Sequence, residues 1–472
     1  MSLIDSTAIP AAATGYDVDN SCKFEKDNSE RLARSYGNIG TPTNADKFTL
    51  SIWLKRTELQ PSGEDIFFCG NAGAVTTLFG FQNDVLKFRT NSGDTEIKTN
   101  RVFRDTASWY HIMVVYDSTD STEANRVKFY VNGVQETSLG TANYPTQNAD
   151  SEMFETNMSH YVGSPDGTQT APGYYTELYF LDGQVKQPTD FGEFDTDSGI
   201  WIPKAYDGSF GDEGYYLDFE DGSNLGLDVS GNSNNFNALY NISAADQSVD
   251  TCTNNFATWL SDGTQFNIST DNETFKEGGT QFVNRAGTGW TAVYPTQSFA
   301  GGKWYMEVKV HSDNELAMYG AMPVARINNL ERQNQYHGQD VDGSIGIYGD
   351  GGQIYYGTAG SGGSGSALSA GDIIGLAIDM ENYKMYFAVN NTYVESGNPA
   401  GNSNGRSIEQ EPYVFSIAQY SPNTDTETNF GGYTVFSNTH TNTDSNGRGQ
   451  FVYQPPSGFL ALCSKNLGET GG

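Results

Sequence analysis

A long predicted β-hairpin occurs twice in this sequence and constrains the fold more than any other feature. The first copy runs from Trp109 to Gly133, as an apolar strand, a polar turn and a return strand. It closes on Asn132-Gly133, a pair that favours a tight reversal because both residues tolerate positive φ. The second copy joins residues 371–379 to residues 384–391. Two copies so far apart predict two related β-sandwich domains rather than a short-period repeat array.

The composition also favours an all-β chain. Aromatic residues reach 13% and glycines number 54 among 472 residues, whereas stretches typical of helices are nearly absent. Residues 47–55 alternate, with Phe48, Leu50, Ile52 and Leu54 on one side. This period of two predicts a strand with one buried face. The length suffices for two or three domains with separate cores.

The charge excludes several classes of partner. With 26 basic and 58 acidic residues the net charge is −32, which repels nucleic acid phosphates and anionic membranes. No stretch is apolar enough to span a bilayer, and the N-terminal residues do not resemble a signal peptide. We therefore expect a soluble protein made in a cytosol, with no nucleic acid partner and no membrane insertion. The cysteines are far apart, which predicts free thiols and leaves a single disulfide open; they are Cys22, Cys69, Cys252 and Cys463.

Several short sequence segments resemble segments of known proteins and occur in the same order along the chain. Residues 19–24, 48–56 and 109–133 resemble the laminin-G/concanavalin A-like lectin domain, in the version found in virion proteins of tailed bacteriophages, particularly marine ones. Residues 303–310 and 371–387 resemble the SPRY domain, which is another concanavalin A-like sandwich. Further short segments resemble the same phage proteins, at residues 199–204, 214–226, 228–236, 253–258 and 454–467.

The resemblance and the patterns together predict five segments. They are an N-terminal arm for virion attachment (1–20), a laminin-G/concanavalin A-like sandwich (21–190), a packed connector (191–262), a SPRY-like sandwich (263–445) and a C-terminal segment (446–472). The resemblance implies a structural, non-enzymatic component of a phage virion, such as a tail fibre or appendage. Its implied partners are other virion proteins, further copies of the chain, and a glycan or protein on the host surface. A capsid decoration or cement protein and a glycanase on the same scaffold remain open alternatives.

Loop aromatics are the best binding signal, because Trp, Tyr and Asn bind sugars by stacking and hydrogen bonding. The predicted binding residues are Tyr144, Tyr336, His337, Tyr355 and Tyr356. The competing interpretation is that these are ordinary core and sheet-edge residues. No histidine pairs with another at ligand spacing, and His111 lies inside an apolar strand, where we expect a buried, hydrogen-bonded ring.

Acidic clusters supply the remaining candidates. Glu193, Asp195 and Asp197 alternate as on one strand face, and a retaining glycosidase needs two carboxyl groups about 5–5.5 Å apart. Because Ser198-Gly199 breaks the strand, we expect an acidic turn instead and no enzyme. We expect no cofactor, although Ca²⁺ stays open, since it takes several oxygen ligands. The candidate Ca²⁺ ligands are Asp218, Glu220 and Asp221, with the alternative that these charges simply end a strand; Asp65, Asp84 and Asp94 are weaker candidates suggested by the laminin-G resemblance.

Overall fold

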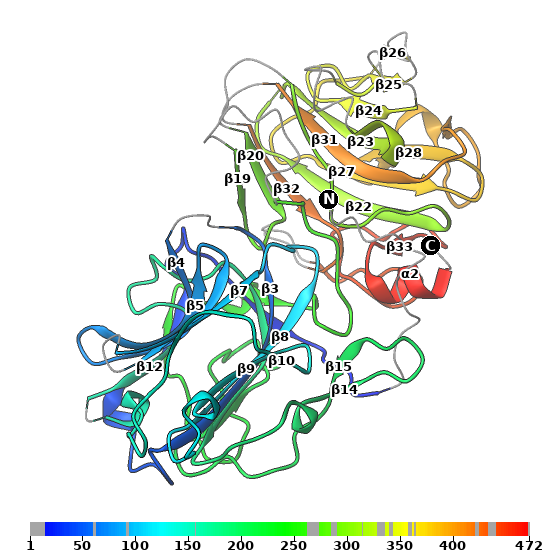
Figure 1. Cartoon of the computed structure of the whole chain (residues 1–472). Helices are drawn as coiled ribbons and strands as arrows, with labels where there is room; N and C mark the ends of the chain where they lie inside the picture. The colour runs from blue at the N-terminus through cyan, green and yellow to red at the C-terminus, as the bar shows by residue number, and fades with distance from the viewer. Residues whose placement is uncertain are drawn as a thin grey trace. The chain divides into compact units, whose positions relative to one another are not determined.

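The chain is built from two all-β units (Figure 1). The computed structural model describes residues 15–59, 63–90, 94–155, 157–261, 273–284, 290–313, 315–327, 336–338, 343–356, 361–362, 365–420, 424–432 and 440–470. One compact unit comprises Ala13–Thr253 and the other contains Asn254–Gly472. The boundary falls inside the predicted connector, because residues 191–253 belong to the first unit. The predicted all-β class with two sandwiches is confirmed.

The first unit is a sandwich of two sheets. One has the order β10-β9-β8-β3-β13-β1-β18, with β16 paired to β13. Its strands are β1 (Ser21–Phe24), β3 (Lys47–Arg56), β8 (Trp109–Asp117), β9 (Val127–Val131), β10 (Val134–Glu136), β13 (Gly173–Asp182), β16 (Tyr215–Leu217) and β18 (Gln247–Ser248). The other has the order β11-β7-β6-β5-β4-β12-β2-β17. Its strands are β2 (Arg31–Arg34), β4 (Glu64–Asn71), β5 (Val75–Gln82), β6 (Val85–Thr90), β7 (Thr95–Val102), β11 (Leu139–Asn143), β12 (Ser159–Val162) and β17 (Ala238–Tyr240).

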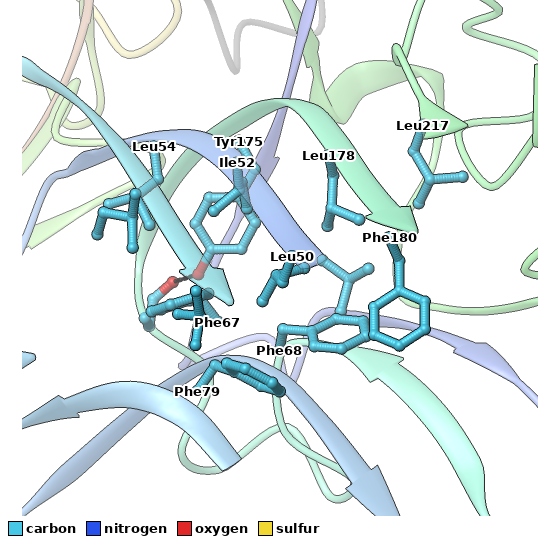
Figure 2. Close-up of a cluster of buried hydrophobic side chains, with 14 of the residues drawn as sticks. Leu50, Ile52, Leu54, Phe67, Phe68, Phe79, Tyr175, Leu178, Phe180 and Leu217 are labelled. Atoms are coloured by element: carbon cyan, nitrogen blue, oxygen red, sulfur yellow. Dashed lines mark hydrogen bonds between the residues drawn. The ribbon is translucent and has the colours of Figure 1, made fainter. Parts of the chain in front are cut away.

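The core of the first unit lies between these two sheets. Figure 2 shows side chains from both sheets meeting in one cluster, among them Leu50 from β3, Phe68 from β4 and Phe79 from β5. The alternation predicted for β3 is confirmed for this inner face. The outer face of β3 is buried as well, which corrects the expectation of one buried face. This face is buried because residues 184–250 cover it. For example, Thr49 Oγ1 on β3 donates to the carbonyl of Gln184 at 2.9 Å.

The predicted hairpin forms as β8, β9 and β10, all antiparallel. Asn132 and Gly133 form its two-residue turn, with φ of +48° and +78°. A Cβ added at Gly133 would lie 2.4 Å from the ring of Trp201, so this turn also requires glycine for space. Trp201 belongs to a small separate hairpin of β14 (Gly192–Phe194) and β15 (Trp201–Pro203).

Buried ion pairs attach the predicted connector to the first sandwich. Lys55 Nζ on β3 lies 2.8 Å from Asp250 Oδ2, and Trp109 Nε1 donates to Asp250 Oδ1 at 3.1 Å. Arg34 on β2 pairs with Glu213 at 2.6 Å. The connector is thus packed, as predicted, and forms part of the first unit.

The N-terminal segment is described only from residue 15 onward, so residues 1–14 of the predicted arm lie outside the described residues. Tyr16 donates from its hydroxyl to the buried carboxylate of Glu177 at 3.2 Å. Val18 donates from its backbone N–H to Thr253 Oγ1 at 3.1 Å. Residues 15–20 therefore belong to the first unit.

The second unit is also a sandwich of two sheets. One has the order β19-β20-β32-β22-β27-β28-β29, with β30 on β28 and β33 parallel to β22. Its strands are β19 (Glu273–Lys276), β20 (Gln281–Asn284), β22 (Lys303–Val310), β27 (Ile373–Asp379), β28 (Lys384–Val389), β29 (Thr392–Tyr393), β30 (Arg406–Ser407), β32 (Thr424–Asn429) and β33 (Leu460–Ala461). The other has the order β21-β31-β23-β24-β25-β26. Its strands are β21 (Thr291–Val293), β23 (Ala317–Pro323), β24 (Ile345–Tyr348), β25 (Ile354–Tyr356), β26 (Ser361–Gly362) and β31 (Tyr413–Gln419).

The second predicted hairpin is confirmed in this unit as β27 and β28, in which Asp379 pairs with Lys384. Side chains from both sheets again form the core, including Met306, Tyr319 and Phe415. The C-terminal segment packs on the same unit through β33 and α2 (Ser464–Thr470), whose Leu467 enters the core. Short 3-10 helices join strands in the two units: η2 (Tyr36–Asn38), η4 (Glu123–Asn125), η5 (Glu152–Phe154), η6 (Pro188–Asp190), η7 (Ala244–Asp246), η8 (Val324–Arg326) and η9 (Val394–Ser396).

Two further predictions concern thiols and membranes. No disulfide joins the four cysteines, all of which lie among the described residues, and three of them are buried. Among the described residues, no helix is long and apolar enough to cross a membrane.

Candidate functional site

Gly346 on β24 leaves a hollow on the outer face of the second unit's smaller sheet. Gly320 on β23 is the register partner of Gly346 and, on its other side, of Ser416 on β31. Because Gly346 has no side chain, His337 can pack directly on β24, whereas a Cβ at Gly320 would meet the carbonyl of Ile345 in the next strand. A Cβ added at Gly346 would come within 3.1 Å of His337.

His337 occupies this hollow and is fully buried. Its Nε2 lies 2.5 Å from Ser416 Oγ, and burial lowers the pKa of its imidazole to about 3, so the ring is neutral at pH 7. The neighbouring Gly338 donates its N–H to Ser344 Oγ at 2.8 Å. This burial corrects the prediction that His337 presents its ring to a ligand. Its role is to hold segment 336–338 against the sheet.

The segment held by His337 brings Tyr336 into a group of aromatic rings, which we call the aromatic cluster: Trp290, Tyr336, Tyr348, Tyr355 and Tyr420. Each of these side chains is partly exposed. Four rings form a closed circuit, with centroid separations of 5.1 Å (Trp290–Tyr336), 5.7 Å (Tyr336–Tyr355), 5.8 Å (Tyr355–Tyr348) and 6.4 Å (Tyr348–Trp290). Tyr420 lies 5.5 Å from Trp290. The structure thus brings together two predicted binding residues, Tyr336 and Tyr355.

Buried apolar side chains on the outer face of the sheet support the cluster. Met318 on β23 is the register partner of Tyr348 on β24 and of Ala418 on β31. These residues, with Met322 and Val414, form a second hydrophobic layer against which Trp290 and the tyrosines pack. The rings therefore rest on a firm base and keep their remaining surface toward solvent.

Hydroxyl and carboxylate groups lie close to these rings. Burial raises the pKa of the Tyr348 hydroxyl, and the Asp350 carboxylate together with the Tyr355 and Tyr336 hydroxyls raises it further. The cluster accordingly combines apolar ring surface with several hydrogen-bonding groups, the combination that small-molecule sites use for affinity and orientation.

Tyr356 lies on β25 next to Tyr355 but takes a different partner. It is 37% exposed, and the Arg406 guanidinium lies 4.8 Å from its ring centroid and donates to its hydroxyl at 3.2 Å. Arg406 in turn pairs with Glu395. Tyr356 is therefore an accessible tyrosine held by an arginine, on the opposite face of the strand from Tyr355.

Tyr144 lies in the other unit, apart from the other predicted binding residues. It follows β11, is partly buried, and packs against the core of the first sandwich. Burial raises the pKa of its hydroxyl. These contacts are those of a sheet-edge tyrosine.

Two of the three predicted Ca²⁺ ligands, Asp218 and Asp221, use carboxylate oxygens within local turns, and Glu220 is exposed. Asp218 accepts from the N–H of Glu220 at 3.1 Å, and Asp221 accepts from the N–H and hydroxyl of Ser223 at 2.9 and 2.6 Å. The hydroxyl of Ser223 lowers the pKa of Asp221, whereas burial raises the pKa of Asp218. Within the part of the chain that the structure describes, no three His, Cys, Asp or Glu side chains gather as a metal site would require.

The weaker Ca²⁺ candidates are ion-pair partners or lie exposed. Arg56 reaches Asp65 at 3.1 Å and Asp84 at 3.0 Å, and all three side chains are buried. Burial raises the pKa of Asp65 to about 6. Asp94 is exposed in the turn just before β7. The first two carboxylates thus neutralise a buried arginine.

The predicted acidic alternation ends after one strand residue. Glu193 is an exposed residue of β14, which stops at Phe194. Asp195 then accepts from the N–H of Ser198 at 2.7 Å and from its hydroxyl at 2.6 Å, and the hydroxyl lowers the carboxyl pKa. Glu193, Asp195 and Asp197 consequently do not share a strand face, as the break at Ser198-Gly199 predicts.

Sequence reasoning missed three members of the aromatic cluster: Trp290, Tyr348 and Tyr420. For Tyr348 the signal was the strand alternation of residues 345–348. Ile345 and Ile347 face the core, so Tyr348 lies on the opposite face of the sheet. Trp290 and Tyr420 flank β21 and β31, and only the pairing of these two strands brings them together.

Comparison with known proteins finds a family model similar to part of the first sandwich. Residues 33–187 match the model of the concanavalin A-like lectin/glucanases superfamily. No curated protein matches the chain.

Solved structures similar to the chain include two SPRY domains and a pentraxin. The SPRY domain of human HERC1 has 13% identity and a TM-score of 0.26, covering 32% of this chain and 89% of that one. A second human SPRY domain has 15% identity and a TM-score of 0.25, covering 34% and 94%. The heptameric SAP-like pentraxin of Limulus polyphemus has 14% identity and a TM-score of 0.25, covering 37% and 76%.

Proposed function

We propose that this chain is a non-enzymatic, glycan-binding component of a phage particle, most simply a tail fibre or appendage that contacts the host surface. The observation that carries the binding role is the aromatic cluster, a circuit of partly exposed rings on a firm apolar base. The concanavalin A-like family of residues 33–187 supports the same role, because that superfamily is named for its lectins.

The cluster suits a sugar ring in two ways. The C–H faces of a pyranose pack against Trp and Tyr rings, whose apolar area is large for few rotatable bonds. The hydroxyls of Tyr336, Tyr348 and Tyr355 and the nearby Asp350 carboxylate can hydrogen-bond the sugar hydroxyls. Each contact is weak by itself, so several copies on one particle would supply avidity.

Three features support the particle role. Short sequence segments between residues 19 and 467 resemble segments of tailed-phage virion proteins and occur in the same order. The net charge of −32 disfavours nucleic acid and anionic membranes as partners. The proposal places the protein in the virion as a homo-oligomer among other virion proteins, without catalysis and without a cofactor.

The test incubates the labelled protein separately with candidate host cells and with virions that lack it. We expect staining of cells, and competition by soluble glycans from the host surface. Trp290→Ala and Tyr355→Ala should each weaken cell binding at least tenfold, whereas Tyr36→Ala, at a 57% exposed tyrosine of the other unit, should not. A chelator should leave binding unchanged.

Each alternative outcome identifies a different function. Staining of virions alone would overturn the receptor role and favour a decoration or cement protein, which a high copy number per particle would confirm. Cell staining that protease treatment abolishes and glycans do not reduce would make the ligand a protein.

A further inference from the structure

A second group of side chains, in the first unit, joins three ionisable residues that the proposed function does not use. Lys23 Nζ lies 3.1 Å from Asp246 Oδ1 and 3.7 Å from Glu30 Oε1. Their residue exposures are 1% for Lys23, 2% for Glu30 and 5% for Asp246. An amine and two carboxyl groups are thus enclosed together, away from water.

The three residues come from distant parts of the first unit. Lys23 is on β1, the first strand, and Asp246 ends η7, just before β18, the last strand. These strands pair antiparallel, with Ser21 opposite Ser248 and Cys22 opposite Gln247, so the same register places Lys23 opposite Asp246. Glu30 immediately precedes β2 in the facing sheet. Backbone pairing therefore fixes the amine against one carboxyl group, and the facing sheet supplies the other.

Each carboxyl group is set up differently. Asp246 Oδ2 accepts from the N–H and the hydroxyl of Ser243 at 2.8 and 3.2 Å, while its Oδ1 faces Lys23. Glu30 accepts from the N–H of Glu25 at 2.7 Å, and burial raises the pKa of its carboxyl to about 7. At neutral pH Glu30 is therefore present in both its protonated and its ionised form, as a proton relay requires.

We propose that Lys23 and Asp246 become joined by an amide bond between Nζ and Cγ, with Glu30 as the proton relay. The product is an intramolecular cross-link between the first and last strands of the first unit. It is a self-modification, independent of glycan binding.

The reaction needs no reagent beyond these residues. The reaction begins with the transfer of one proton from the Lys23 amine to Oδ1 of Asp246, which frees the Nζ lone pair. The Nζ lone pair attacks Cγ, and the N–H of Ser243 stabilises the negative charge that develops on Oδ2. Glu30 takes a proton from Nζ and delivers one to Oδ1. The Cγ–Oδ1 bond then breaks, water leaves, and Glu30 regains its original state.

The first unit contains a matched comparison for this site. Lys55 on β3 and Asp250 also form a buried pair, at 2.8 Å, and Trp109 Nε1 donates to this carboxylate. Burial lowers the pKa of the Lys55 amine, against the charges of Asp250 and Asp105, which raise it. The register of β1, β13 and β3 puts Lys23 and Lys55 on either side of Tyr174 in one cross-strand row. The proposal assigns the cross-link to Lys23 alone.

The deciding experiment is the intact mass of the full-length protein under denaturing conditions. We expect a mass lower than that of the sequence by one water molecule, and a proteolytic peptide that joins the segments around Lys23 and Asp246. A mass equal to that of the unmodified chain would overturn the proposal. A joined peptide at Lys55 and Asp250 instead would overturn the assignment.

Three variants separate the reaction from the fold. Lys23→Arg and Glu30→Gln should each restore the full mass, and circular dichroism should show whether each retains its β structure. Lys55→Arg should leave the loss of water unchanged. If Glu30→Gln still loses water, Glu30 is not the relay.

Discussion

The two sandwiches treat the outer faces of their sheets differently. In the first unit, residues 184–250 cover the outer face of β3, and charged residues beneath them are paired, as Lys55 is with Asp250. In the second unit, the outer face of the smaller sheet carries apolar side chains under a circuit of rings that remain partly exposed. The first unit thus closes its surface with its own chain, whereas the second leaves an aromatic surface available. This contrast is why we place ligand binding in the second unit.

The largest expected effect tests the buried charges of the first unit. Arg56→Met should lower its free energy of unfolding by about 3 kcal/mol, because Asp65 and Asp84 would remain buried with only the half-exposed Arg104 and the more distant Lys26 to pair with. In the second unit Arg406→Met breaks a partly exposed pair with Glu395 and should cost less than about 1 kcal/mol. Urea unfolding of both variants measures the difference. Equal losses would show that the two units do not differ in how they hold charge.

The next effect concerns one glycine from each predicted hairpin. Gly133 and Gly371 have φ of +78° and +90°, but only Gly133 faces another side chain, the ring of Trp201. Gly371→Ala should cost roughly 1 kcal/mol from backbone strain, and Gly133→Ala roughly 3 kcal/mol because the Trp201 ring must also move. Thermal unfolding measures both. If the two variants lose the same stability, the β14–β15 hairpin does not restrain the first turn.

Acid should reveal a smaller difference between the units. Burial lowers the pKa of His111, His160 and His337 to about 3, so all three are neutral in the fold and protonate on unfolding below pH 6.5. At each of these histidines the unfolded chain then binds more protons, so its contribution to stability falls as the pH falls, by about 2 kcal/mol at pH 5. Burial raises the pKa of Glu307 and Glu315 in the second unit, and of Glu30 and Glu177 in the first, to about 7, so these carboxyl groups add stability as the pH falls. The histidine contribution is therefore measured against the unchanged protein: His337→Gln should remove about 2 kcal/mol of acid sensitivity from the second unit, and His111→Gln the same amount from the first, where His160 remains.

Unfolding curves between pH 7 and pH 5 measure this prediction. His111 Nε2 lies 2.8 Å from Ser51 Oγ, and the Trp201 indole N–H donates to His111 Nδ1 at 3.0 Å. This confirms the prediction of a buried, hydrogen-bonded histidine at this position. An unchanged pH slope in His337→Gln would mean that its ring is protonated in the fold.

The smallest expected effect is at the acidic turn of the first unit. Replacing Glu193 and Asp195 together by alanine should leave glycan binding unchanged, because both residues belong to the first unit and the aromatic cluster belongs to the second. Any release of sugar from a glycan should also stay the same. A lower rate of release in the double variant would restore the glycanase alternative.

Local patterns predicted the architecture well. The alternation from Phe48 to Leu54 and the Asn132-Gly133 turn depend on neighbouring residues, so the sequence displays them directly. The burial of His337 could not be predicted in this way, because it depends on the pairing of β24, β23 and β31, which places Gly346 and Ser416 in one row. The aromatic cluster likewise needs the pairing of β21 with β31 and of β23 with β24. Composition indicated that aromatic residues matter, but only strand register selects which of them meet.

The pairing of β1 with β18 has a consequence for how this fold can be reused. Ser21 lies opposite Ser248, and Val18 bonds to Thr253, so the chain enters and leaves the first unit at neighbouring points. A domain with adjacent ends can be placed within a surface loop of another protein with little distortion of its host. The first sandwich is therefore suited to being gained, lost or exchanged as a cassette during evolution.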